Sequence, residues 1–116
     1  MAILDADYSA LDHDNLASSI GLKTKYIPIL MKSFFDETTL ILEALEESIE
    51  HKEYDKIRLN AHAIKGSAGN LKFNEIYEMA KEIEFEAAKK SSDFEYKLYF
   101  EAIKKAMNTI SLSSFV

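Results

Sequence analysis

The sequence predicts an all-α protein, folded as an antiparallel up-down four-helix bundle with a short additional helix near the N-terminus. Two observations predict this class. The 116 residues include only three glycines and one proline, so the chain has few points at which a helix would break. Apolar residues recur at intervals of three and four along most of the chain, which is the spacing of one face of an α-helix. No Asn-Gly or Asp-Gly pair indicates a β-hairpin.

Five segments show this helical spacing. A short helix is expected over residues 14–20, with the sequence DNLASSI. The first long apolar stripe runs over residues 27–49, and the next two run over 54–71 and 73–87. The last stripe covers residues 96–110. The connections between them are short, and short connections favour antiparallel neighbours.

Local signals support several helix starts. Pro28 lies in the first turn of the first long helix, where proline is tolerated. Asn74 is a candidate N-cap for the third long helix. Ser92 and Glu95 have the spacing of a capping box before the last helix.

Composition limits the function. We expect one domain over residues 1–116 that acts as a monomer. The absence of cysteine excludes disulfides, thiolate catalysis and cysteine-type zinc sites. A net charge of −6 argues against general nucleic-acid binding. No apolar run approaches the roughly 18 residues of a membrane span, and the N-terminus is acidic where a secretory signal would be basic. We therefore expect a cytoplasmic protein without a membrane contact, and Met1 together with the absence of a linker favours a free-standing one.

The stretch AHAIKGSAGNL at residues 61–71 holds two of the three glycines. At 100° per residue, His62 points roughly 125° away from the centre of its helix's apolar stripe. Arg58, Lys65, Gly66 and Gly69 lie within about 60° of His62 on the same outward face. Glycine in a helix interior costs about 1 kcal/mol relative to alanine, so two glycines here indicate that another macromolecule must approach this face.

The charge and chemistry of this face suit phosphate. Residues 54–72 carry four cations and one acid, a net charge of +3 in an acidic chain. Histidine is substantially neutral near pH 7, so one ring nitrogen offers a free lone pair to an electrophile. A phosphoryl group on His62 would add nearly two negative charges, which Lys65 could offset through charge-assisted hydrogen bonds.

This stretch is similar to the signature of histidine-containing phosphotransfer (HPt) domains: a histidine, an apolar residue two positions on, then Lys-Gly-Ser and a leucine. The flanking sequences YIPILMKSFFDETTLILEALEESI and NEIYEMAKEIEFEAAKK resemble the family's neighbouring helices, so the resemblance covers roughly residues 20–110. One position departs from the family, which usually has glycine after the motif's leucine, where this chain has Lys72.

The resemblance implies a helical bundle whose exposed histidine, here His62, takes a phosphoryl group from a receiver-domain aspartate or a hybrid histidine kinase and passes it on. It also implies a phosphotransfer intermediate of two-component signalling, with no cofactor, no metal and no kinase activity of its own. In related domains of chemotaxis-type kinases a glutamate of the following helix lies against the histidine, and Glu84 has a similar offset. A solvated acid is the alternative interpretation of Glu84.

Two other functions remain open. The bundle could be a non-catalytic adaptor that docks a receiver domain through the glycine-cleared face without accepting phosphate. A metal-binding bundle is disfavoured, because three histidines without paired Glu-x-x-His spacing supply too few convergent ligands.

Overall fold

The structure is a computed structural model that describes residues 4–114, and it confirms the all-α class. The described residues form five α-helices and one short 3-10 helix, with no strand among them. In chain order the elements are α1 (His13–Ile20), η1 (Thr24–Tyr26), α2 (Ile27–Glu50), α3 (Tyr54–Asn70), α4 (Asn74–Ala88) and α5 (Tyr96–Ser114).

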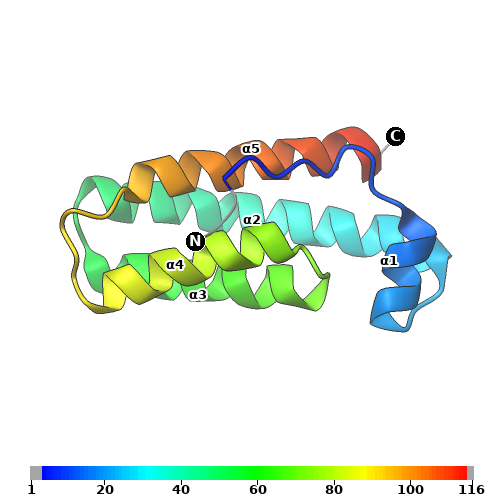
Figure 1. The fold of residues 1–116 in the computed structure, drawn as a ribbon, viewed down its shortest axis with the longest axis horizontal. Coiled ribbons are helices and arrows are strands. Elements are labelled where there is room, and N and C mark those ends of the chain that lie inside the picture. The colour runs from blue at the N-terminus through cyan, green and yellow to red at the C-terminus, as the bar shows by residue number, and fades with distance from the viewer. Residues whose placement is uncertain (1–3, 115–116) are drawn as a thin grey trace.

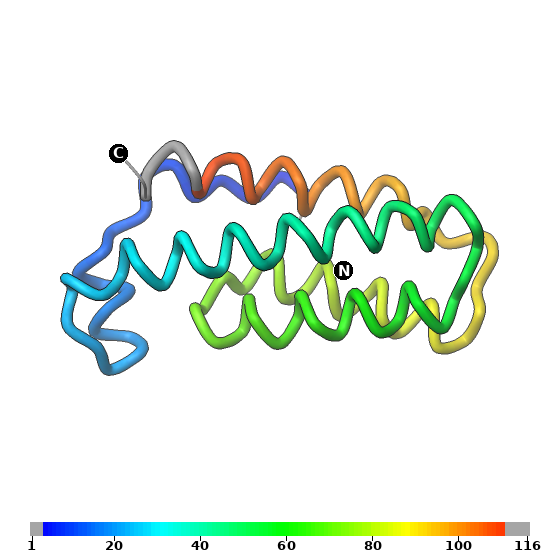
Figure 2. Tube along the Cα trace, turned by 180° about the vertical axis from the view of Figure 1, so that it is seen from behind, coloured from blue at the N-terminus to red at the C-terminus, as the bar shows by residue number. Residues whose placement is uncertain are grey.

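The four long helices α2 to α5 lie side by side along the longest dimension of the molecule, which measures 43 Å (Figure 1). Each of them runs opposite to the one before it in the chain, as the colour sequence in Figure 1 shows. The most extensive helix–helix contact joins α3 to α4, and α2 packs against both α3 and α5. Helix α1 lies at one end of the four long helices (Figure 2). No helix within residues 4–114 has the length and apolar character that crossing a membrane requires.

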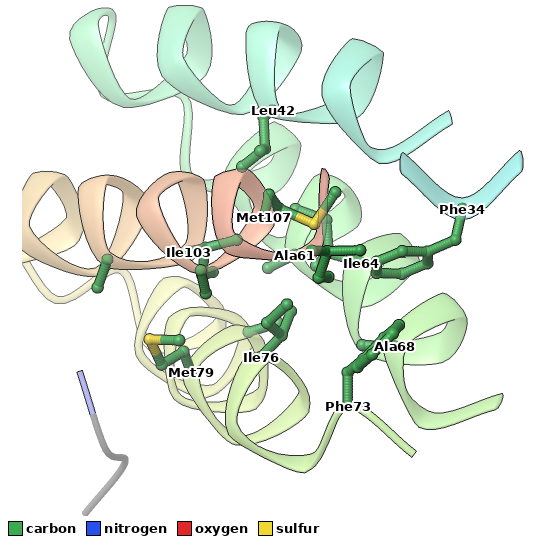
Figure 3. Packing of buried hydrophobic residues seen from close by; sticks show 14 of the residues in the cluster. Phe34, Leu42, Ala61, Ile64, Ala68, Phe73, Ile76, Met79, Ile103 and Met107 are labelled. Atoms are coloured by element: carbon green, nitrogen blue, oxygen red, sulfur yellow. The ribbon is translucent and has the colours of Figure 1, made fainter. Parts of the chain in front are cut away.

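The core lies between the long helices and fixes which way α3 faces. Figure 3 shows Ala61, Ile64 and Ala68 of α3 turned toward apolar side chains of α4 and α5. Ala61 and Ile64 are fully buried. Because these positions hold one face of α3 against the bundle, the opposite face of the helix, including His62, points to solvent.

The predicted stripes of α3, α4 and α5 match the buried positions, and that of α2 matches them in part. Its members Ile27, Phe34, Thr38 and Leu45 are buried, and the stripe also includes Leu30 and Ile41. Leu30 and Ile41 are only partly buried, while Met31 and Leu42, one residue further along, belong to the core. Helix α2 is covered by α3 on one side and α5 on the other. Its buried face is therefore wider than a single stripe, and the spacing of apolar residues located only part of it.

Two predicted helix caps are wrong. Asn74 is the first residue of α4 and not its cap, because buried Phe73 occupies the N-cap position. Ser92 lies outside α5, which begins only at Tyr96, so the capping box does not form. The physical reason is aromatic packing: the ring of Phe94 lies 4.9 Å from that of Tyr96 and 4.7 Å from that of Tyr99. These contacts hold the segment as a bend.

Three helices end on a lysine with left-handed backbone. Lys52, Lys72 and Lys90 have φ angles of 53°, 62° and 56°, and they follow the ends of α2, α3 and α4. In each case the next amide donates to the carbonyl oxygen five residues earlier, as from Phe73 to Ala68. This is the Schellman closure of a helix C-terminus, in which glycine usually occupies the left-handed position. Lys72 therefore stands at a position whose backbone favours the glycine that the family usually has there.

Candidate functional site

His62 lies in the middle of α3 with 63% of its side chain exposed. Its exposure follows from the register of the helix, because the neighbours Ala61 and Ile64 are fully buried. The imidazole is therefore accessible to another protein, and the backbone of His62 belongs to α3, which has its most extensive contact with α4.

Glu84 of α4 connects the two central site residues of α3. Its Oε2 atom lies 2.7 Å from Nδ1 of His62, and its Oε1 atom lies 2.7 Å from Nζ of Lys65. A carboxylate only accepts hydrogen bonds, so Nδ1 of the neutral imidazole carries the proton and donates it. The lone pair is then on Nε2.

Glu84 and Lys65 each stabilise the charged form of the other. Burial by itself raises the pKa of Glu84, but the hydrogen bonds from Lys65 and His62 outweigh it and lower that pKa below its usual value. The hydrogen bond to Glu84 raises the pKa of Lys65. Both groups are thus charged at neutral pH. Only 20% of the Glu84 side chain and 24% of the Lys65 side chain are exposed, so the pair is partly shielded from water.

The two glycines of the motif have different surroundings. A Cβ atom added at Gly66 would meet nothing within 4 Å, so this position lies under open space. A Cβ atom added at Gly69 would lie 3.2 Å from a ring carbon of Tyr77. Gly69 therefore allows the Tyr77 ring of α4 to pack close to α3. The open space that the sequence predicted above both glycines is present only at Gly66.

Arg58 lies one turn before His62 and lines a shallow groove of about 580 Å³ formed by α3 and α4. Lys65, Glu84 and Phe85 line the same groove. The structure thus brings four of the predicted positions, Arg58, His62, Lys65 and Gly66, onto one face of α3. Phe85 was not predicted as a site residue.

The other two histidines are placed elsewhere. His13 begins α1, and His51 follows the end of α2. Within residues 4–114 no group of three or more histidine, aspartate or glutamate side chains has the arrangement of a metal site.

The sequence model of the Hpt domain family matches residues 29–110. The chain therefore belongs to the Hpt domain family, and membership implies histidine phosphotransfer in phosphorelays. Hpt domains interact with receiver domains and histidine kinases in phosphorelays. No curated protein and no solved structure matches the chain significantly.

Proposed function

We propose that this chain is a histidine phosphotransfer protein and that His62 carries the phosphoryl group between receiver-domain aspartates. The observation that carries this proposal is the contact between Nδ1 of His62 and Glu84, on an imidazole that is otherwise exposed. The contact leaves Nε2 unprotonated and directed away from the acid, which is the state that a nucleophile needs.

The transfer step balances without an external base. The Nε2 lone pair of His62 forms the new N–P bond, while the O–P bond of the aspartyl phosphate breaks and its electron pair stays on the aspartate carboxylate. The proton on Nδ1 remains hydrogen-bonded to Glu84, which stabilises the positive charge that develops on the ring. The reverse step returns the phosphoryl group to the aspartate of another receiver domain.

Lys65 offsets the negative charge of the phosphoryl group. Its ammonium group is held by Glu84 one helical turn from His62, and a flexible lysine stem allows it to move toward the new phosphoryl oxygens. Arg58 and Gly66 belong to the surface that the partner covers. Arg58 contributes a positive charge, and Gly66 has no side chain that would keep the partner away from α3. Gly69 contributes indirectly, through the packing of α3 against Tyr77 of α4.

The scaffold of this function is, on our interpretation, an up-down four-helix bundle within a single domain that includes α1. The domain works as a cytoplasmic monomer, takes phosphate from a receiver domain or a hybrid histidine kinase, and needs neither a cofactor nor an ATP site. The family match supports the exchange of phosphate with these partners, and the outward face of α3 leaves His62 accessible to them.

The direct test is incubation with a radiolabelled, phosphorylated receiver domain. The wild-type chain should gain acid-labile phosphate, and His62→Gln should gain none while keeping its circular dichroism spectrum. His13→Gln and His51→Gln are matched controls and should label as wild type. Labelling of His62→Gln would contradict the assignment of the nucleophile. Tight binding of the receiver without any labelling of the wild-type chain would identify a docking adaptor instead.

A further inference from the structure

Phe85 is the most exposed aromatic side chain among the residues whose side chains the structure describes, at 61%. Most of the other aromatic rings of the chain are packed into the core or against its edge. Phe85 follows Glu84 on α4, and the Nζ atom of exposed Lys89 lies 4.6 Å from its ring centroid. An exposed cation–π contact of this kind is weak and easily displaced.

The position of Phe85 ties it to the phosphotransfer site. It lines the same groove as Arg58, Lys65 and Glu84, and two of these residues make the network around His62. A protein that covers the imidazole therefore lies directly beside this groove.

Leu59 provides a second apolar group on the other side of α3. It lies one turn before His62, is 57% exposed, and lines a groove of about 270 Å³ between α2 and α3 with Ala44. Residues three apart on a helix lie on neighbouring parts of its surface. The histidine thus has Leu59 on the α2 side and the Phe85 groove on the α4 side.

We propose that Leu59 and Phe85 are the apolar anchors that dock the receiver domain on both sides of His62. This inference rests on the proposed function. Phosphoryl transfer requires the aspartate of the receiver to reach Nε2 of His62, so the surface around that aspartate must lie over the same turn of α3. Gly66, on the next turn, leaves room for that surface to come close. Exposed apolar side chains beside such a contact lose their water on docking, and large buried side chains near the centre of an interface dominate its affinity.

The test compares two phosphate donors on the same variants. Phosphoramidate labels a reactive histidine without any protein partner, whereas a phosphorylated receiver domain must dock first. Phe85→Ala and Leu59→Ala should label with phosphoramidate at the wild-type rate. With the receiver domain as donor, the KM of each should rise about tenfold or more, with little change in kcat. Phe85→Leu should restore part of the loss. Leu98→Ala is the matched control. Leu98 is 49% exposed, and it lies on α5, which packs against α2 and α4 and not beside the helix that carries His62.

The outcomes separate the two proposals. Wild-type KM values for both Phe85→Ala and Leu59→Ala would overturn the docking inference and leave His62 as the nucleophile. If neither donor labels the wild-type chain, the proposed function itself is overturned. An equal rise in KM for Leu98→Ala would show that any loss of exposed apolar surface weakens binding, which would also overturn the assignment of these two anchors.

Discussion

Nδ1 of His62 on α3 and Oε2 of Glu84 on α4 lie 2.7 Å apart, although the two residues are separated by 22 positions in the chain. The contact exists because α3 and α4 form the most extensive helix pair. It determines which ring nitrogen carries the proton, and with it which nitrogen is available to phosphorus.

Removal of the Glu84 carboxylate should slow phosphorylation by releasing this constraint. In Glu84→Ala the Nδ1 atom of His62 loses its acceptor, so the fraction of imidazole with a free Nε2 lone pair falls. Phosphate uptake should fall by about tenfold for each 1.4 kcal/mol lost at the transition state. Nitrogen-15 NMR of the imidazole provides a second readout, since Nε2 should be unprotonated in the wild type and partly protonated in the variant. Glu78→Gln, which lines the same groove, is the control. An unprotonated Nε2 in both proteins would contradict this role.

Lys65→Ala should leave folding nearly unchanged and slow transfer. The ion pair with Glu84 is only partly shielded from water, so its loss should lower the free energy of unfolding by about 1 kcal/mol at most and leave the fold intact. The docked partner excludes water and strengthens the interaction of Lys65 with the doubly charged phosphoryl group. Lys65→Arg should retain part of the rate, because the charge remains while the geometry changes. Time courses of phosphate uptake at low and high salt measure this, with Lys104→Ala, at an exposed position of α5, as the control. Equal rates for wild type and Lys65→Ala at both salts would make Lys65 an ordinary surface lysine.

The two glycines of the motif should respond differently to alanine. Gly66→Ala should raise the free energy of unfolding by about 1 kcal/mol, because alanine favours helix and its Cβ meets only open space. Gly69→Ala should gain less, because its Cβ would force the Tyr77 ring to shift. Gly66→Leu should slow transfer from the receiver without loss of stability, whereas Gly69→Leu should lower stability. Urea unfolding and phosphate uptake measure the two effects. Equal gains from the two alanine variants would show that Tyr77 adapts freely.

Removal of either of two buried hydroxyl groups of α2 should change the free energy of unfolding, in opposite directions. Thr38 is fully buried and its Oγ1 atom has no hydrogen-bond partner among the described residues. Thr38→Val should therefore raise the free energy of unfolding by about 1 kcal/mol, since it removes an unsatisfied polar atom. Ser48 is also buried, but its Oγ donates to the carbonyl oxygen of Leu45 at 2.8 Å. Ser48→Ala should lose up to about 1 kcal/mol. Urea unfolding of both variants checks the contrast, and a loss of stability in Thr38→Val would indicate an unseen partner for its hydroxyl.

The order of the helices and the outward face of His62 could be predicted from the sequence because both depend on a local period of 3.6 residues. The details that depend on contacts between helices could not. Helix α2 is covered on two sides, so its buried face exceeded the predicted stripe. Phe94 and its aromatic neighbours overrode the capping signal of Ser92. The exposure of Phe85 follows from the same helical period, since it lies outside the buried stripe of α4, but its place beside Arg58 and Lys65 depends on how α3 and α4 pack.

The helix ends were the least predictable feature, because lysine replaces glycine in the left-handed position at Lys52, Lys72 and Lys90. At Lys72 the φ angle is 62°. A non-glycine residue in this conformation costs roughly 1–2 kcal/mol, and the greater freedom of glycine in the unfolded chain offsets about 0.5–1 kcal/mol of that. Lys72→Gly should therefore raise the free energy of unfolding by about 0.5–1 kcal/mol.

Replacement of lysine by glycine inside a helix should change the free energy of unfolding in the opposite direction. Lys81 lies within α4, so Lys81→Gly should lower the free energy of unfolding by about 1 kcal/mol. Urea unfolding of the two variants isolates the backbone effect, because each removes one lysine from the exposed surface. Phosphate uptake should be unchanged in Lys72→Gly, since residue 72 lies beyond the end of α3, more than two helical turns from His62. A loss of stability in Lys72→Gly would mean that the lysine side chain stabilises the end of α3 by more than its backbone strain costs.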